Sequence, residues 1–228
     1  MVPRRVFSFW LGENPMSQKR RRCWTSLEHT GLEVVRITRE TVGDWVLPDE
    51  PLHPAFEFLS SVHRADYLRA YVMHHHGGGY TDVKMIRVRW VECLERLERS
   101  ELYGAGYREI GRSGVANTGG LQYRFLQLNY RRLIGNCAFV FRPRTPFTTE
   151  WMAELTRRLD KIQHDLQRYP AKHAKDKLGL EFNGKPSRYP VSAGDLMGKV
   201  FHPLVYKYRR RLSQCLPPPD FTGYDDYA

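Results

Sequence analysis

The sequence predicts an α/β domain in which helices flank a mostly parallel central sheet, and two observations indicate it. An apolar run rich in β-forming residues, 6–10, is followed by a polar helical segment at 17–28 and a second strand at 32–37. Strand, helix and strand in such close succession form a βαβ unit, whose strands run parallel. The second observation is size: 228 residues, 41% of them hydrophobic, suit one domain with its own core. We expect the domain to span 1–215 and the proline-rich segment 216–228 to form an extended tail.

A long helix and a glycine turn are expected after the βαβ unit. Apolar residues recur at helical spacing from about 55 to 76, which predicts a helix with a broad apolar stripe. The glycines at 77–79 end that helix. The following apolar segment, 80–86, predicts another strand, and 90–97 predicts a helix.

The second half of the chain alternates polar segments with apolar ones. Residues 104–120 are rich in glycine and polar side chains, which predicts a mobile loop near a site. A strand is expected at 136–141 and an amphipathic helix at 147–166. The basic stretch 170–190 is interrupted by proline and glycine and predicts a loop.

The net charge of +11 limits the classes of partner. Three basic runs carry much of it: 19–22, 131–132 and 209–211. Nucleic acid, an anionic membrane surface and a phosphate-bearing small molecule all suit such runs, and so do plain solvated faces. No zinc-finger spacing, basic zipper or RNA-binding aromatic pattern occurs, so a nucleic-acid partner is disfavoured.

The cysteines and the hydropathy bear on the compartment. Cys23, Cys93, Cys137 and Cys215 are scattered without a CxxC pair, which excludes the usual zinc spacings and favours a reducing compartment over a disulfide scaffold. No apolar run approaches the length of a membrane-spanning helix, and the apolar stretch near the N-terminus is too short for a secretory signal. We therefore expect a cytoplasmic protein.

A candidate site lies where the predicted strand after the glycine turn ends. Asp82 interrupts an apolar β pattern there, and ligands of open α/β sheets bind at such ends. Its carboxylate can bind a divalent cation or sugar hydroxyls, although it can also simply cap a turn. Asp66 and Arg69, at i and i+3, share one face of the preceding helix. If that helix folds back, this face points at Asp82; otherwise the two form a weak surface ion pair.

These residues resemble a known family. The pattern Asp-x-x-Arg, followed by Gly-Gly-x-Tyr-x-Asp at 77–82, is similar to the sugar-binding region of DXD-motif glycosyltransferases of the family 32 and capsular polysaccharide synthesis type. The segment 9–12, Phe-Trp-Leu-Gly, resembles the opening strand of that family. The segment 136–146, NCAFVFRPRTP, is similar to its asparagine-containing strand.

The resemblance implies a GT-A architecture, a single Rossmann-like domain that binds a nucleotide-sugar donor and usually Mn²⁺ or Mg²⁺. Trp10 would stack on the base, Asp66 and Arg69 would contact the sugar, and Asp82 would serve the ribose and the metal. Tyr80 would pack beneath the site. The complete set that would bind the donor comprises Trp10, Leu11, Gly12, Asp66, Arg69, Gly78, Tyr80, Asp82 and Asn136.

Lys84 departs from the family pattern, which has a second, metal-binding carboxylate at that position. A lysine ammonium can supply part of the positive charge that a leaving diphosphate requires, so we expect Lys84 to act in catalysis with Asp82. His202 is the candidate for a further metal ligand, although a lone histidine is more often structural. Asp195 is expected to contact an acceptor hydroxyl or the donor, or else to begin a helix as an N-terminal acid.

The leading hypothesis is a glycosyltransferase that moves a sugar, with UDP-sugars favoured as donors, to a glycan or lipid-linked acceptor. The resemblance, and not the sequence itself, implies that the reaction retains the configuration of the sugar. Two alternatives remain. Lys84 suits a non-catalytic relative that binds nucleotide sugars, and the net charge suits a module that binds nucleic acid or an anionic surface.

Overall fold

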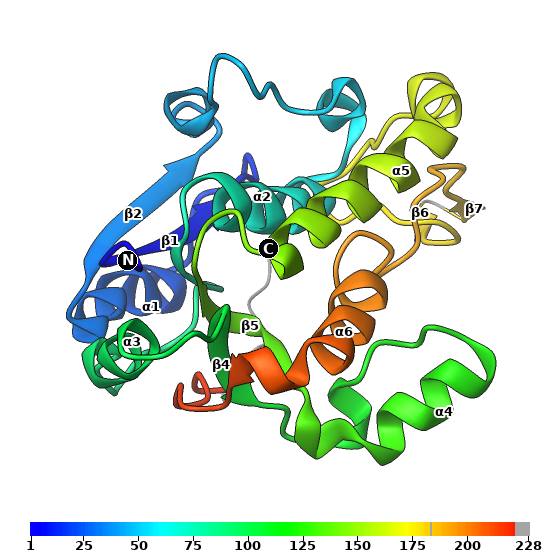
Figure 1. Cartoon of the computed structure of the whole chain (residues 1–228). Coiled ribbons are helices and arrows are strands. Elements are labelled where there is room, and N and C mark those ends of the chain that lie inside the picture. The colour runs from blue at the N-terminus through cyan, green and yellow to red at the C-terminus, as the bar shows by residue number, and fades with distance from the viewer. Residues whose placement is uncertain (183, 222–228) are drawn as a thin grey trace.

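The computed structural model describes residues 1–182 and 184–221, and its centre is a six-stranded sheet (Figure 1). Parallel pairs join β2 to β1, β1 to β3 and β4 to β8, whereas β5 runs antiparallel to β3 and β4. The predicted α/β class with a mostly parallel sheet is therefore confirmed. In spatial order the strands are β2 (Glu33–Thr38), β1 (Arg5–Trp10), β3 (Gly78–Thr81), β5 (Ile134–Phe141), β4 (Gly104–Arg108) and β8 (Leu212–Ser213).

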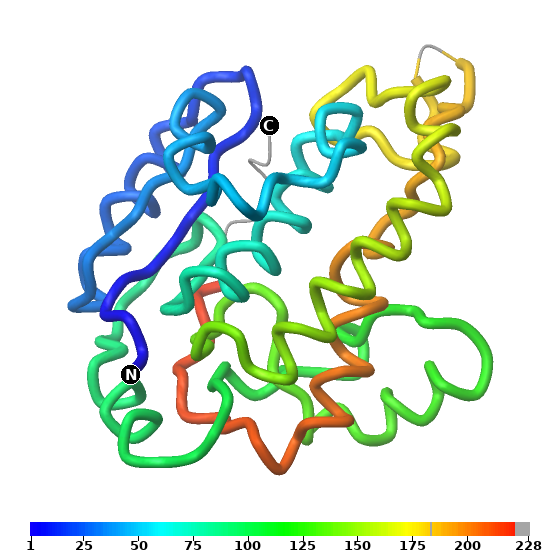
Figure 2. Tube along the Cα trace, turned by 45° about the horizontal axis from the view of Figure 1, so that its top comes forward, coloured from blue at the N-terminus to red at the C-terminus, as the bar shows by residue number. Residues whose placement is uncertain are grey.

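Helices cover both faces of the sheet, because the strand side chains alternate between two apolar cores. Phe7 and Phe139 belong to the larger core, and their neighbours Val6 and Val140 belong to the smaller one. The larger core includes α2 (Ser61–His75), α5 (Pro146–Arg168) and α6 (Gly198–Lys207); the smaller includes α3 (Val91–Glu98) and residues that follow α1 (Gln18–Ser26). Figure 2 shows α5 and α6 running side by side.

Two predicted elements differ from the observed ones around the glycine turn. The helix expected over 55–76 begins as a separate 3₁₀ turn, Pro54–Phe58, and α2 starts only at Ser61, where the Ser60 hydroxyl accepts a hydrogen bond from the His63 amide. The strand expected over 80–86 ends at Thr81. Asp82 consequently comes directly after β3, at the carboxyl end of a parallel strand.

The glycine-rich loop expected over 104–120 is wrong for its first part, which forms β4 inside the sheet. Glycine is required there for packing: a Cβ on Gly104 would lie 2.4 Å from the Phe141 ring. Composition alone favours a loop, because glycine weakens an isolated strand. The same stretch leads to α4 (Gly120–Leu128), a helix that the sequence analysis missed. The described part of the expected loop over 170–190 forms a small hairpin of β6 (Glu181–Phe182) and β7 (Lys185–Pro186) and is otherwise without helix or strand.

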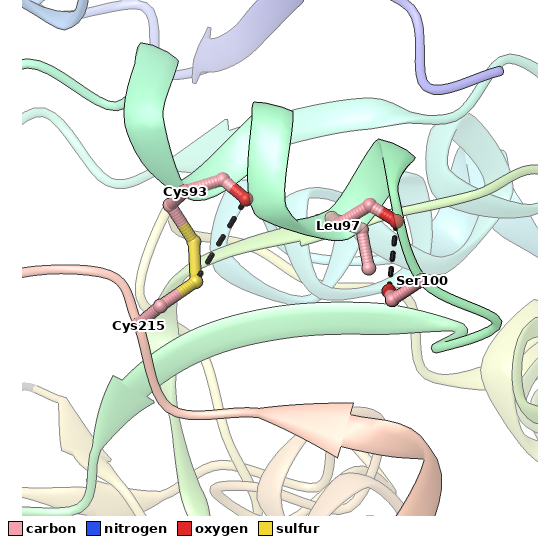
Figure 3. The surroundings of a disulfide bond; sticks show 4 residues. All are labelled: Cys93, Leu97, Ser100 and Cys215. Atoms are coloured by element: carbon pink, nitrogen blue, oxygen red, sulfur yellow. Dashed lines mark hydrogen bonds between the residues drawn. A yellow bond between two sulfur atoms is a disulfide. The ribbon is translucent and has the colours of Figure 1, made fainter.

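A disulfide between Cys93 of α3 and Cys215, just after β8, corrects the expectation of reduced cysteines for this pair (Figure 3). Their Cα atoms lie 5.6 Å apart although 122 residues separate them in sequence. Beyond it, the Asp220 amide donates to the Met85 carbonyl and the Asp220 carboxylate pairs with Arg87. The predicted extended tail is thus held against the domain as far as residue 221, and its remainder, 222–228, lies outside the described residues.

No helix in the described ranges combines the length and the apolar character that crossing a bilayer requires.

Candidate active site

Arg69 bridges the two carboxylates that the sequence analysis placed beside it. Its Nη2 atom lies 3.0 Å from Oδ1 of Asp82, and its Nη1 atom lies 3.5 Å from Oδ1 of Asp66. The i,i+3 spacing on α2 puts Asp66 and Arg69 on one helix face, and the glycine turn returns the chain so that Asp82 meets that face. The predicted grouping of these three side chains is therefore what the structure contains.

Two further residues hold the Asp82 carboxylate. The Tyr80 hydroxyl donates to Oδ1 at 2.8 Å, and the Lys84 Nζ atom lies 3.4 Å from Oδ2. The Arg69 guanidinium also lies over the Tyr80 ring, 4.8 Å from its centroid. The side chains of Asp66, Arg69, Asp82 and Lys84 are no more than 13% exposed. Two carboxylates thus share a buried region with two cations, and we call these four residues the charge cluster.

Burial acts differently on the two acids of the charge cluster. Burial raises the pKa of Asp66 above its ordinary value, and the nearby Arg69 only partly offsets that effect. For Asp82 burial also opposes ionisation, but Arg69, Lys84 and the Tyr80 hydroxyl outweigh it and hold the pKa below its ordinary value. Neighbouring acids whose pKa values are pushed in opposite directions are typical of functional sites.

A cavity of about 140 Å³ opens beside the charge cluster. Residues from the end of β1, from α2 and from the end of β3 line it together, among them Trp10, Leu11, Gly12, Arg69, Tyr80 and Asp82. A larger cavity of about 480 Å³ adjoins it, because Leu11, Asn14, Ser61 and Ala174 line both. Ligand sites commonly occupy about 300–1,000 Å³, so the pair has room for a nucleotide-sized molecule.

The larger cavity is rich in basic side chains, which the sequence analysis had not assigned to a site. Arg39, Arg64 and Lys172 line it, with Glu13 as the one acidic residue among its described lining. The segment carrying Lys172 reaches the cavity through two backbone bonds, from Ala171 N to the Phe58 carbonyl and from Val62 N to the Ala174 carbonyl. The only sign of this basic lining in the sequence was the basic composition of 170–190, which does not show where that segment lies in the fold.

Trp10 lies where a base could stack on it. The indole is half-buried in the wall of the smaller cavity, and its Nε1 atom donates to the Asn14 carbonyl at 3.1 Å. That bond holds the ring plane at the end of β1. The geometry is compatible with the predicted stacking role.

Gly78 and Asn136 do not line the cavity. Gly78 begins β3, at the end of the strand remote from Asp82, where a Cβ would lie 2.9 Å from the Arg5 carbonyl oxygen. Asn136 contributes its backbone carbonyl, which accepts a bond from Arg69 Nη1 at 3.3 Å. Asn136 therefore supports the charge cluster from outside the cavity, whereas Gly78 packs against the start of β1. Direct donor contact by either residue stays a prediction.

Asp195 and His202 have local partners of their own. The Asp195 carboxylate accepts from the Ser192 amide at 2.7 Å and pairs with Lys199 at 2.6 Å, just before α6. His202 is fully buried; its Nδ1 atom accepts from the Ala116 amide at 3.0 Å, and its Nε2 atom lies 3.6 Å from Glu109. These contacts match a structural role for both residues: Asp195 as an acid just before a helix and His202 as a buried structural histidine. The predicted catalytic role of Asp195 and metal-binding role of His202 stay predictions.

The described residues do not fit the Mn²⁺ or Mg²⁺ that the resemblance implies. Within 1–182 and 184–221, no group of three His, Cys, Asp or Glu side chains is arranged to hold a metal ion. Asp82 faces the ammonium of Lys84 where a second carboxylate would complete a hard-cation site. A divalent ion at Asp82 would also meet the repulsion of Arg69.

Comparisons with known proteins add little to this picture. No family model and no curated protein sequence matches the chain. Among solved structures, the PaToxG glycosyltransferase is similar, with a TM-score of 0.44 and 10% sequence identity; the match covers 73% of this chain and 64% of that protein's chain. A likeness this distant defines neither a family nor an activity.

Proposed function

We propose that this protein is a glycosyltransferase that takes its sugar from a nucleotide-sugar donor. One observation carries the proposal: Arg69 joins Asp66 to Asp82 beside a cavity whose wall also contains Trp10. An aromatic wall suits a base, a guanidinium fork suits phosphate or sugar oxygens, and an ionised carboxylate accepts bonds from hydroxyl groups. UDP-sugars are the favoured donors, and a glycan or a lipid-linked sugar is the favoured acceptor, with retention of configuration.

The roles follow from position. Asp82 is ionised and lines the cavity, so it accepts hydrogen bonds from the ribose or the transferred sugar. Arg69 binds the donor directly, and Asp66, which does not line the cavity, orients the guanidinium. Lys84 lies behind Asp82 and keeps that carboxylate charged.

The leaving nucleoside diphosphate requires positive charge as the glycosidic bond breaks. Arg69 supplies it in the smaller cavity, and Arg39, Arg64 and Lys172 supply it in the adjoining one. Charge from fixed protein groups costs no reorganisation at the moment of reaction, which is the basis of electrostatic preorganisation.

The test is a thermal-shift panel of nucleotide sugars, followed by an assay for release of the nucleoside diphosphate. A donor at about one hundred times its dissociation constant stabilises the folded state by about 2.7 kcal/mol. We expect one sugar nucleotide to stabilise the protein and to be turned over, and Asp82→Asn to abolish turnover. Stabilisation by none of the panel would refute the proposal.

A non-catalytic binder is the second candidate, and the charge cluster favours it. Asp82 already has Arg69, Lys84 and Tyr80 as partners, so the site is complete without a substrate. This candidate predicts stabilisation by a nucleotide sugar without transfer or hydrolysis, including after prolonged incubation.

A further inference from the structure

One face of α4 exposes an apolar stripe to solvent. Leu121, Phe125 and Leu128 are 83%, 47% and 71% exposed, and they lie at i, i+4 and i+7. That spacing places them on a single helix face, which in a globular protein normally packs against the core. Arg124, also exposed, lies on the same face. Figure 1 shows α4 at the edge of the molecule, next to α6.

A strongly basic cavity of about 620 Å³ lies at the β8 edge of the sheet. Arg131, Arg132, Arg209 and Arg210 line it, and none of the described residues lining it is acidic. Gln214 joins the two arginine segments, since its Nε2 atom donates to the carbonyls of Arg131 and Leu133 at 2.8 and 2.9 Å. Two basic runs far apart in the sequence thus form one positively charged surface.

The stripe and the basic cavity are continuous. The Phe125 ring packs edge-on against Tyr206 at 4.8 Å, and the Arg209 guanidinium lies 4.4 Å from the centroid of the same Tyr206 ring. At its C-terminal end, α4 is followed within a few residues by Arg131 and Arg132. We call this whole area, the α4 stripe with the four arginines, the basic–apolar surface.

A partner for the basic–apolar surface must offer both negative charge and an apolar phase. A second copy of the chain would bring a like-charged surface against it, because a two-fold interface pairs identical patches. Nucleic acid supplies the charge, but its bases stack on aromatic side chains, whereas two of the three stripe residues are leucines. A bilayer that contains anionic lipid supplies both, headgroup charge for the arginines and acyl chains for the stripe.

We propose that the basic–apolar surface docks this protein peripherally on a membrane that contains anionic lipid. The stripe enters the headgroup region and the four arginines bind lipid phosphates. This inference is independent of the transferase proposal, because no residue of the surface belongs to the charge cluster or its cavities.

The test is co-sedimentation of the full chain with vesicles of phosphatidylcholine alone, or with about one-third phosphatidylserine. We expect binding to the anionic vesicles only. Each arginine near a membrane is worth about fivefold in affinity, so Arg132→Gln with Arg210→Gln should weaken binding about 30-fold. Neither side chain has a hydrogen bond or ion pair within the described residues, so the thermal unfolding midpoint should not change. Leu121→Gln with Leu128→Gln should weaken binding by more than about tenfold.

The matched control is Arg21→Gln with Arg22→Gln, which removes the same charge from the exposed run on α1. We expect this pair to bind the anionic vesicles within about twofold of the wild type. Absence of wild-type binding would overturn the proposal, and so would an equal loss in the control pair or full binding by the leucine variant. A dimer that the leucine variant abolishes would assign the surface to a second copy instead.

Discussion

The Nζ atom of Lys84 lies 3.4 Å from Oδ2 of Asp82, so the carboxylate that follows β3 faces an ammonium group. With Arg69 on the other oxygen, each of the two acids of the charge cluster has a compensating positive charge. The site is therefore electrostatically balanced by protein groups alone.

Arg69→Met should lower the free energy of unfolding by about 3–5 kcal/mol, because it leaves Asp66 and Asp82 buried without their shared cation. Arg157→Met is the control: it removes an exposed i,i+3 pair with Glu154, for which we expect less than about 1 kcal/mol. Urea unfolding of both variants gives the comparison. Equal losses would mean that the charge cluster does not stabilise the fold.

Protonation of Asp82 should lower the stability of the protein at acidic pH. Because its pKa is lower in the folded state than in the unfolded one, its contribution is complete above about pH 4 and disappears as the pH falls through the folded pKa. Asp66 has the opposite sign: its raised pKa means that protonation favours the folded state as the pH falls.

Unfolding free energies of the wild type, Asp82→Asn and Asp66→Asn, measured from pH 7 downwards, separate the two acids. In Asp82→Asn the free energy of unfolding should decrease less steeply as the pH falls below about 4. In Asp66→Asn it should decrease more steeply on acidification than in the wild type. Parallel curves for all three proteins would contradict the opposite pKa shifts.

Trp10→Ala should weaken UDP binding by about 1–3 kcal/mol, the usual worth of a base stacked on an aromatic ring. Trp10→Phe keeps a stacking face and should recover most of the affinity, although it loses the bond to the Asn14 carbonyl. Calorimetric titration measures both. If Trp10→Ala binds UDP as tightly as the wild type, the base lies elsewhere.

The disulfide should be detectable chemically and thermodynamically. Alkylation of the unfolded protein without reductant should modify Cys23 and Cys137 only. Cys93→Ser with Cys215→Ser should lower the free energy of unfolding by about 2–4 kcal/mol, and reductant should then have no further effect. Modification of all four cysteines in the untreated protein would contradict the bond.

Local sequence signals predicted the parts of this protein that depend on short-range geometry. The βαβ unit follows from apolar periodicity, and the meeting of Arg69 with Asp82 follows from helix spacing and one tight turn. The prediction for β4 was wrong because its glycines are required for close packing inside the sheet. A glycine-rich strand of this kind has the same composition as a loop.

Features that join distant segments could not be predicted in this way. The Cys93–Cys215 bond and the meeting of Arg131 with Arg209 depend on the order of strands in the sheet. The approach of Lys172 to the cavity depends on backbone bonds between its segment and the region of Phe58 and Val62. A single sequence does not contain that order as a local pattern. The position of Lys84 two residues after Asp82, by contrast, was visible in the sequence, and the structure places its ammonium group against the Asp82 carboxylate.

The most direct measurement is a calorimetric titration of UDP into the wild type and Arg69→Met, in EDTA and again in Mn²⁺. The charge cluster should bind the nucleotide with fixed protein charge, so the wild type should give the same dissociation constant in both solutions. Arg69→Met should lose binding in both. Binding by the wild type that appears only with Mn²⁺, or Arg69→Met binding as tightly as the wild type, would contradict this account.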